Sequence, residues 1–437
     1  MDATTVVIIA AVVFAWGTIS ARLGRAHLTA PIVFMAVGVL AANLGHVDQP
    51  ALAEDIKPLV TTTLVWVLFA DAARVRMRDF RHDLAVYVRL LAIGLPLTML
   101  SGWAVAYWLL PALGVWLALL VAAALAPTDA ALGVPVVTDP AVPSRIRRLI
   151  SVESGLNDGI ATPVVMLAIA GAISAERLGE AANLWHAAVE LAVGAAVGVV
   201  VGVAGGWLLR WGLRRGWAAA DFAGVAVLAL ALLAYGSAHL LHGNGFVAAF
   251  CAGLAFGAAV GRLGPAEMGF LEQASGLVSL LVWLAFGAVA VPIAFDHLTP
   301  AVLAYAVLSL TLLRMVPVAL SLIGAGLDRR TVLFVGWFGP RGLASLVFAL
   351  LAIEEIGPAA EEAVSVIAVT VFLSVLVHGA SAQPLATRYG RAMASQGPQP
   401  GGPVPEVPVR GLPGARAHHP APAGGRESPR SREQKAG

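Results

Sequence analysis

The chain has 437 residues, of which 59% are hydrophobic and 12% are charged, and its formal net charge is +2. Soluble domains carry about a quarter charged residues, so this composition excludes an ordinary globular protein. The single cysteine, Cys251, excludes an internal disulfide framework and a cysteine-based metal cluster, and we expect no nucleic-acid partner.

Long apolar runs recur along almost the whole chain, as an all-α polytopic membrane protein requires. The N-terminus lacks the basic segment of a signal peptide, so we expect the first run to be a helix and not a cleaved leader. The pattern predicts about thirteen transmembrane helices, at residues 4–21, 30–46, 57–74, 84–110, 112–138, 145–172, 183–211, 219–241, 244–261, 267–294, 299–325, 330–353 and 361–387.

Arginines gather in alternate connections between these runs, for example around residues 74–81, 145–148 and 210–215. The other connections are mostly acidic or neutral. Because cytoplasmic loops carry the excess of basic residues, we expect a multi-pass plasma (inner) membrane protein with its N-terminus outside and its C-terminus in the cytoplasm.

The last part of the chain differs in composition from the rest. Residues 391–437 are rich in Pro, Gly, Arg and Ser and poor in large apolar residues. Such a segment buries too little apolar surface to fold alone. We therefore expect a membrane domain at residues 1–390, followed by a disordered cytoplasmic tail.

Two of the predicted helices contain helix-breaking residues together with a charge. Helix 5 carries Pro127, Asp129 and Pro135, and helix 12 carries Pro340 and Arg341. Both are therefore expected to be discontinuous. Because they are seven helices apart, they run in opposite directions, which is typical of inverted-topology repeats, here helices 1–6 and 8–13. Asp129 would offset the positive ends of the half-helices and Arg341 the negative ends.

Helix 6 carries a cluster of polar residues, Glu153-Ser154-Gly155-Leu156-Asn157-Asp158, between apolar stretches. A charged residue in mid-membrane costs roughly 2.5–3.5 kcal/mol on insertion scales, so such residues usually have a function. Partial desolvation favours the protonated form of a carboxylate. Asp158 could therefore exchange a proton for a hard alkali cation, which prefers oxygen ligands.

These motifs resemble those of the monovalent cation:proton antiporters, specifically the NhaP/NHE branch of Na⁺/H⁺ exchangers. The matching strings are Ala126-Pro127-Thr128-Asp129, the helix 6 cluster, Gly339-Pro340-Arg341-Gly342, and Val377-His378-Gly379 followed by Pro384. They occur in the order and spacing of the family across residues 1–390.

The resemblance implies a homodimer whose membrane domain is divided into core and dimerisation subdomains. It also implies a protein that is not an enzyme, needs no cofactor and acts in pH and sodium homeostasis. It implies that Asp158 binds cation and proton in turn, and that Na⁺ is bound by Asp158, Asp129, Thr128 and Ser154. Asp71 on helix 3 is a further ligand, although its position near the cytoplasmic end also suits a funnel residue. Glu153 is expected to pair with a helix 11 arginine, where Arg314 is the only basic residue.

Within the resemblance, Asn157 followed by Asp158 goes with electroneutral one-for-one exchange, because an amide does not titrate. The residues leave Na⁺, K⁺ and Li⁺ open, since all three use the same oxygen ligands, so a K⁺/H⁺ antiporter is an alternative. A passive cation channel is a second. An intramembrane hydrolase using Ser154 or Ser345 with His378 is a third, although no Gly-x-Ser-x-Gly turn surrounds either serine.

Overall fold

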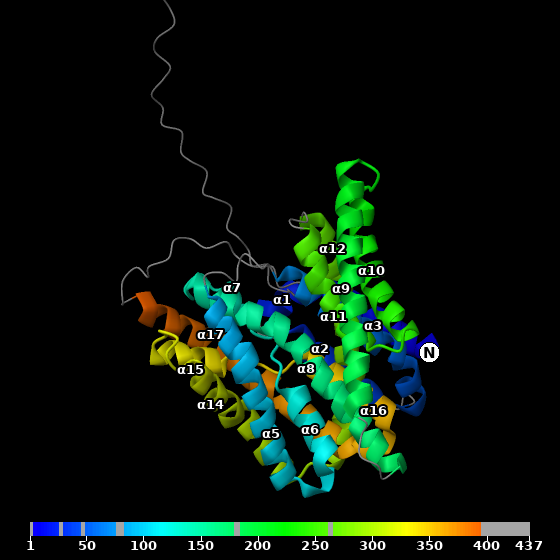
Figure 1. Ribbon diagram of the computed structural model, residues 1–437. Coiled ribbons are helices and arrows are strands. Elements are labelled where there is room, and N and C mark those ends of the chain that lie inside the picture. Colours follow the sequence, from blue (N-terminus) through cyan, green and yellow to red (C-terminus); the bar gives the residue numbers. More distant parts are fainter. Residues whose placement is uncertain are drawn as a thin grey trace, which may run out of the picture.

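The computed structural model describes residues 3–25, 29–44, 49–75, 83–178, 184–260 and 265–394. Within these ranges all regular structure is helical (Figure 1). The predicted tail lies outside the described residues, except for its first four residues, 391–394.

The first half of the chain forms eight α-helices, one π-helix and one short 3-10 helix. They are α1 (Ala3–Arg25), α2 (Ala30–Asn43), α3 (Gln49–Arg74), α4 (Leu84–Val88), the π-helix η1 (Arg89–Gly94), α5 (Leu95–Leu109), the 3-10 helix η2 (Pro111–Leu113), α6 (Gly114–Leu125), α7 (Val134–Thr138) and α8 (Ser144–Leu178).

The second half forms nine α-helices and one 3-10 helix. They are α9 (Leu184–Arg214), α10 (Ala220–Leu240), α11 (Gly245–Val260), α12 (Pro265–Asp296), α13 (Pro300–Leu310), α14 (Leu312–Ser321), α15 (Arg329–Trp337), α16 (Leu343–Ile356), the 3-10 helix η3 (Gly357–Ala360) and α17 (Glu361–Ala394).

Each of the thirteen predicted ranges contains at least one of these helices. By length and composition, the described part of the chain has eight segments that could cross a membrane, and three shorter apolar helices at Ala30–Asn43, Pro111–Leu125 and Gly245–Val260. The all-helical polytopic fold is therefore established, whereas the count of thirteen spans stays a prediction.

The predicted span at 299–325 corresponds to one candidate span, Pro300–Ser321. It contains a break that the sequence analysis did not predict, because the backbone turns at Thr311 (φ −116°, ψ −94°) between α13 and α14. One predicted boundary was wrong. The last helix does not end at residue 387 but continues to Ala394. Arg388 and Arg391 interrupt the apolar run in the sequence, yet Tyr389 and Met393 stay buried on the inner face. Packing of that face therefore prolongs the helix, and residues 391–394 do not belong to a tail.

Both ranges with helix-breaking motifs are interrupted. Residues 126–133 separate α6 from α7 without regular helix, and residues 338–342 separate α15 from α16. The segment before each of the prolines Pro127 and Pro340 leaves the helix, since a proline lacks the N–H of the helical hydrogen bond and crowds the preceding turn. These two interruptions place backbone groups inside the molecule.

Close helix packing on one side of the molecule depends on small residues. Gly194, Gly198 and Gly202 repeat along α9, and a Cβ at each would lie only 2.3–2.4 Å from a carbonyl oxygen of the segment 244–252. Figure 1 shows α9, α10 and α11 side by side. The glycine stripe therefore serves helix packing, as its four-residue spacing predicts.

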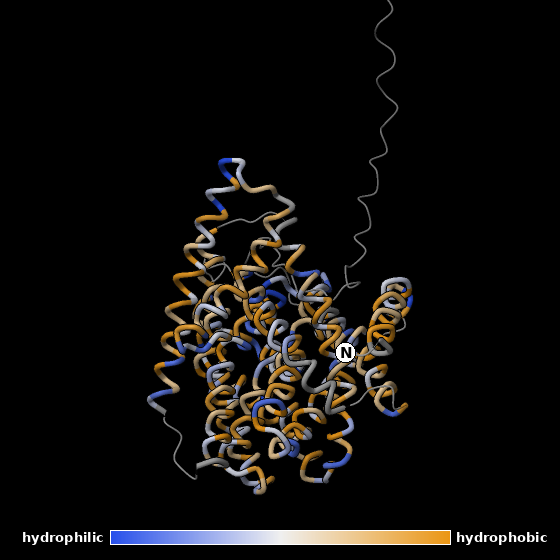
Figure 2. Tube along the Cα trace, turned by 90° about the vertical axis from the view of Figure 1, so that its right-hand side faces the viewer, coloured by the Kyte–Doolittle hydropathy of each residue, from blue (hydrophilic) through white to orange (hydrophobic). Residues whose placement is uncertain are grey.

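Large apolar side chains cover much of the outer surface. Trp108, Trp185, Leu240 and Phe14 are each at least 75% exposed. Figure 2 shows long hydrophobic helices and a strongly hydrophilic turn at the tip where α9 and α10 join. Such a surface fits a lipid environment and not water.

Candidate functional site

The polar cluster of α8 is buried in the middle of the molecule. Glu153, Ser154, Asn157 and Asp158 are each no more than 7% exposed. On the helix, Glu153 and Asn157 share one side, and Ser154 and Asp158 share the adjacent one. The backbone carbonyl of Asp158 accepts a hydrogen bond from Thr162 Oγ1 at 2.8 Å. A sequence segment of six residues thus presents two neighbouring polar faces to its surroundings.

Both faces contact the break between α6 and α7. Asn157 Nδ2 donates to Thr128 Oγ1 at 2.8 Å, and Thr128 Oγ1 lies 3.0 Å from Ser154 Oγ, where either hydroxyl can be the donor. The other amide atom, Asn157 Oδ1, is buried and has no hydrogen-bond partner among the described residues. Three side chains of the predicted site are therefore connected, and an unused oxygen acceptor remains beside them.

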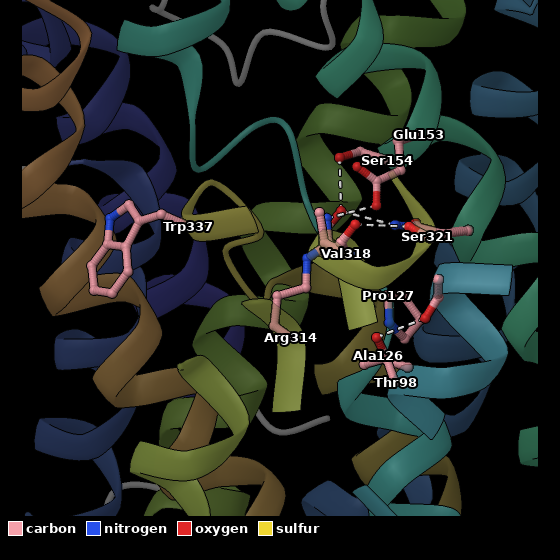
Figure 3. A network of polar contacts seen from close by, with 12 residues as sticks. Thr98, Ala126, Pro127, Glu153, Ser154, Arg314, Val318, Ser321 and Trp337 are labelled. Atoms are coloured by element: carbon pink, nitrogen blue, oxygen red, sulfur yellow. Dashed lines mark hydrogen bonds and ion pairs between the residues drawn. The ribbon is translucent and has the colours of Figure 1, made fainter. Parts of the chain in front are cut away.

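Glu153 contacts α14. Arg314 Nη2 donates to Glu153 Oε1 at 2.6 Å, and the two side chains are 2% and 4% exposed. Figure 3 shows Glu153 and Ser154 on α8 near Arg314 and near the backbone of Ala126 and Pro127. The structure thus brings together two opposite charges that would each be costly alone in an apolar interior.

The two charged residues of the breaks lie at opposite helix ends. The Asp129 carboxylate accepts from the Leu343 N–H at 3.1 Å, at the start of α16, and from the Ala131 N–H at 2.8 Å. Arg341 is fully buried, and its Nη1 donates to the carbonyls of Ala126 (2.6 Å) and Pro127 (3.0 Å), after the end of α6. Each charge therefore offsets the dipole end of the helix that it meets.

The two breaks are in direct contact. The Asp129 N–H donates to Pro340 O at 2.8 Å. A Cβ at Gly342 would lie 2.3 Å from Asp129 Oδ2, and one at Gly339 would lie 2.7 Å from Arg314 Nε. Only glycine leaves room for the two breaks to cross so closely. Because Gly339 lies beside Thr128 and Arg314, the crossing belongs to the polar cluster.

Sequence reasoning missed the support that α17 gives to the second break. Ser374 Oγ accepts from the Arg341 N–H at 2.7 Å and lies 3.1 Å from His378 Nδ1. His378 Nε2 lies 3.1 Å from Trp337 O, the last residue of α15. Nδ1 also lies 3.1 Å from the Ser374 carbonyl, so each ring nitrogen faces a carbonyl acceptor, and the ring links α17 to the end of α15 in either tautomer. The spacing of Ser374 and His378, one helical turn apart in an apolar helix, was the available signal.

Asp71, on α3, takes part in an ion-pair bridge. Its carboxylate lies 3.1 Å from Arg74 Nη1, and Arg74 Nη2 lies 3.1 Å from Glu272 on α12. The backbone of Asp71 nevertheless packs against Gly155, where an added Cβ would lie 3.5 Å from Asp71 O. Asp71 on α3 therefore lies next to the α8 cluster, and its carboxylate is paired with Arg74, which also pairs with Glu272.

Comparison with known proteins agrees with this architecture. The family model described as "Sodium/hydrogen exchanger, transmembrane" matches residues 8–388. The chain is 27% identical over 393 residues to a K(+)/H(+) antiporter NhaP2 of Shewanella sp. (strain MR-4), covering 86% of this chain and 64% of that relative. It is 28% identical over 403 residues to the K(+)/H(+) antiporter NhaP of Alkalimonas amylolytica, covering 90% and 66%. The chain thus spans about two thirds or less of these relatives.

Other relatives differ in the cation that they are named for. A probable Na(+)/H(+) antiporter of Schizosaccharomyces pombe is 27% identical over 359 residues, covering 74% of this chain and 46% of that protein. Among solved structures, the sodium proton antiporter MjNhaP1 of Methanocaldococcus jannaschii superimposes with a TM-score of 0.71 at 20% identity, covering 89% of this chain and 99% of that one. This likeness concerns the fold.

Proposed function

Because the chain belongs to the sodium/hydrogen exchanger family, a family of multi-pass membrane transporters and not of enzymes, we propose that it exchanges a monovalent cation for protons by alternating access. The observation that carries this proposal is the buried cluster of Asp158, Asn157, Ser154 and Thr128 at the crossing of two broken helices. Broken helices near the midplane are where secondary transporters bind their ions.

The donor set suits an alkali cation as substrate. Asp158 supplies a carboxylate, and Ser154 and Thr128 supply hydroxyl oxygens. Asn157 Oδ1, buried without a hydrogen-bond donor in the described structure, supplies a further neutral oxygen. A buried acceptor left unpaired costs about 1–3 kcal/mol, so a bound cation would relieve this cost. Asp129 is already held by two N–H groups, and we assign it the role of keeping the crossing negative.

Exchange follows from competition at Asp158. Either a proton or a cation neutralises the carboxylate, and a neutral site crosses a low-dielectric region at far lower cost than a charged one. If reorientation of the charged site is disfavoured, each inward cation is matched by an outward proton. Asn157 adds no titrating charge, so we propose electroneutral one-for-one exchange.

The test is Asp158→Asn in proteoliposomes with a pH-sensitive dye inside. The variant should reach the membrane in normal amount and lose cation-driven proton movement. Asp296→Asn, which alters an exposed acid at the end of α12, is the matched control and should retain exchange. Normal exchange by the Asp158 variant would overturn the assignment, and cation flux without counter-transport would favour a channel.

The identity of the transported cation, Na⁺ or K⁺, is a further part of the proposal. The relatives include proteins named for each of them, and hydroxyl and carboxylate oxygens serve both. We propose Na⁺ as the first candidate and K⁺ as the alternative. Adding NaCl, KCl or LiCl in turn to vesicles with a preformed proton gradient ranks them, and a response to KCl alone would identify a K⁺/H⁺ antiporter.

We further propose thirteen spans in two inverted repeats, a cytoplasmic C-terminus and a homodimer. We base the homodimer on membership of the exchanger family. Single-cysteine labelling of the connections from either side of the membrane tests the orientation. Native mass spectrometry of the full chain tests the dimer, and a monomer with full exchange would refute it.

A further inference from the structure

One face of α17 changes along the helix from apolar to basic. One side of this helix carries five residues at spacings of three or four, namely 376, 380, 383, 387 and 391. This face lines a groove of about 710 Å³, and Ile32 of α2 lies in its wall. Val375, Leu376 and Ala380 form its apolar part, and Arg388 and Arg391 lie at its polar end.

The polar end lies at the depth of lipid headgroups. α17 has 34 residues, whereas about 20 residues cross a hydrocarbon core of about 30 Å. The helix begins with Glu361 and Glu362, so the hydrocarbon span that starts at Ala363 is complete about one turn before Thr387. The apolar part of the groove therefore faces acyl chains, and its basic part faces headgroups.

The two arginines have charge available for a ligand. Both are exposed, one helical turn apart, and neither has an ion-pair partner among the described residues. The neighbouring polar groups are engaged within the protein: Gln383 Nε2 donates to Asp139 Oδ2 at 3.3 Å, and Thr387 Oγ1 donates to Gln383 O at 3.0 Å. An anionic group in this groove would therefore be held by the two guanidinium groups, whose geometry suits a phosphate.

We propose that the groove between α2 and α17 binds an anionic phospholipid, with its phosphate on Arg388 and Arg391 and an acyl chain along Leu376 and Ala380. Basic pockets between membrane helices bind anionic headgroups in this way. The C-terminal residues 395–437 are a poorer match, because they contain six basic and three acidic residues and would meet the arginines with like charge.

The test titrates phosphatidylglycerol or phosphatidylcholine into the full chain purified in detergent and follows its unfolding temperature. Phosphatidylglycerol should stabilise the protein at lower concentration than phosphatidylcholine. R388Q/R391Q should bind phosphatidylglycerol with an apparent affinity about 30-fold lower, because each arginine near an anionic headgroup contributes about a fivefold gain in affinity. The matched control R329Q/R330Q removes an exposed pair at the start of α15 and should bind as the native chain does.

Two further variants separate the possible occupants. Gly379→Leu fills the apolar part, since a Cβ there meets no atom within 4 Å, and should weaken phosphatidylglycerol binding without lowering stability in its absence. The proposal would be overturned if both lipids raised the unfolding temperature equally. It would also be overturned if R388Q/R391Q and R329Q/R330Q bound phosphatidylglycerol with the same affinity. A chain lacking residues 395–437 that binds phosphatidylglycerol far more tightly would overturn it as well, since the tail would then be the occupant. None of these readouts requires transport, so they stand apart from the proposed exchange.

Discussion

The Glu153–Arg314 pair makes a quantitative test of what holds the cluster together. With both side chains no more than 4% exposed and 2.6 Å between the nearest atoms, the charge centres lie about 4 Å apart. At an effective dielectric constant of about 20 this attraction amounts to about 4 kcal/mol. Removing one partner leaves the other buried and unpaired, which costs about 3–5 kcal/mol. We therefore expect Arg314→Met alone, or Glu153→Leu alone, to be severely destabilising.

The double variant should behave differently. Replacing both charges by apolar groups removes the desolvation cost together with the attraction, so Glu153→Leu/Arg314→Met should recover at least about 2 kcal/mol relative to the sum of the single changes. The assay is unfolding in mixed micelles, followed by tryptophan fluorescence, for the four chains of the cycle.

The exposed pair His186–Glu190, with side chains 73% and 45% exposed, supplies the control cycle. Its coupling should stay below about 1 kcal/mol, because solvent screens exposed charges. If the double variant at Glu153 and Arg314 loses the full sum of the single losses, the pair does not act as a unit, and the reasoning from burial fails.

Three further predictions concern the site. Asn157→Asp adds a second titrating group, so exchange should become sensitive to an imposed membrane potential; a potential-independent rate in that variant would contradict the role given to the amide. Arg74→Gln removes the guanidinium that competes with the cation for Asp71, so it should lower the apparent Michaelis constant for the cation by about two- to fivefold. Glu272→Gln frees Arg74 to pair with Asp71 alone, so it should raise that constant by about two- to fivefold. Shifts of the same sign in both variants would refute the bridge. Gly342→Ala places a Cβ where the carboxylate that caps α16 lies, so it should abolish exchange and cost about 1–3 kcal/mol, whereas Gly236→Ala, which has open space, should have little effect on either measurement.

Much of the fold could be predicted because its causes are local. Apolar runs of sufficient length predict helices, and helices occur in all thirteen predicted ranges. Proline and glycine beside a charge predicted the breaks near Pro127 and Pro340. The break at Thr311 was missed because no proline or glycine accompanies it; its backbone turn (ψ −94°) depends on packing of α13 and α14 against other helices. The extension of α17 was missed because hydropathy averages over both faces of a helix.

The sequence indicated which residues gather at the crossing better than how they connect, and their part in transport stays a prediction. The residue types of Asp158, Ser154 and Thr128 indicated an oxygen-rich site, and the resemblance supplied Arg314 as the partner of Glu153. The unpaired Oδ1 of Asn157 was not predictable, because it depends on which neighbours reach the amide.

The sequence by itself therefore determined the membrane class, the helices, the two breaks and the charged residues beside them, since each depends on neighbours within a few turns. Only the tertiary structure decided which groups meet. Arg314 lies 161 residues from Glu153, and Leu343 lies 214 residues from Asp129. Such contacts follow from the crossing of α6–α7 with α15–α16, where glycines allow backbones to approach and each buried charge must find an opposite charge or dipole. That requirement makes the crossing specific, and no local pattern contains it.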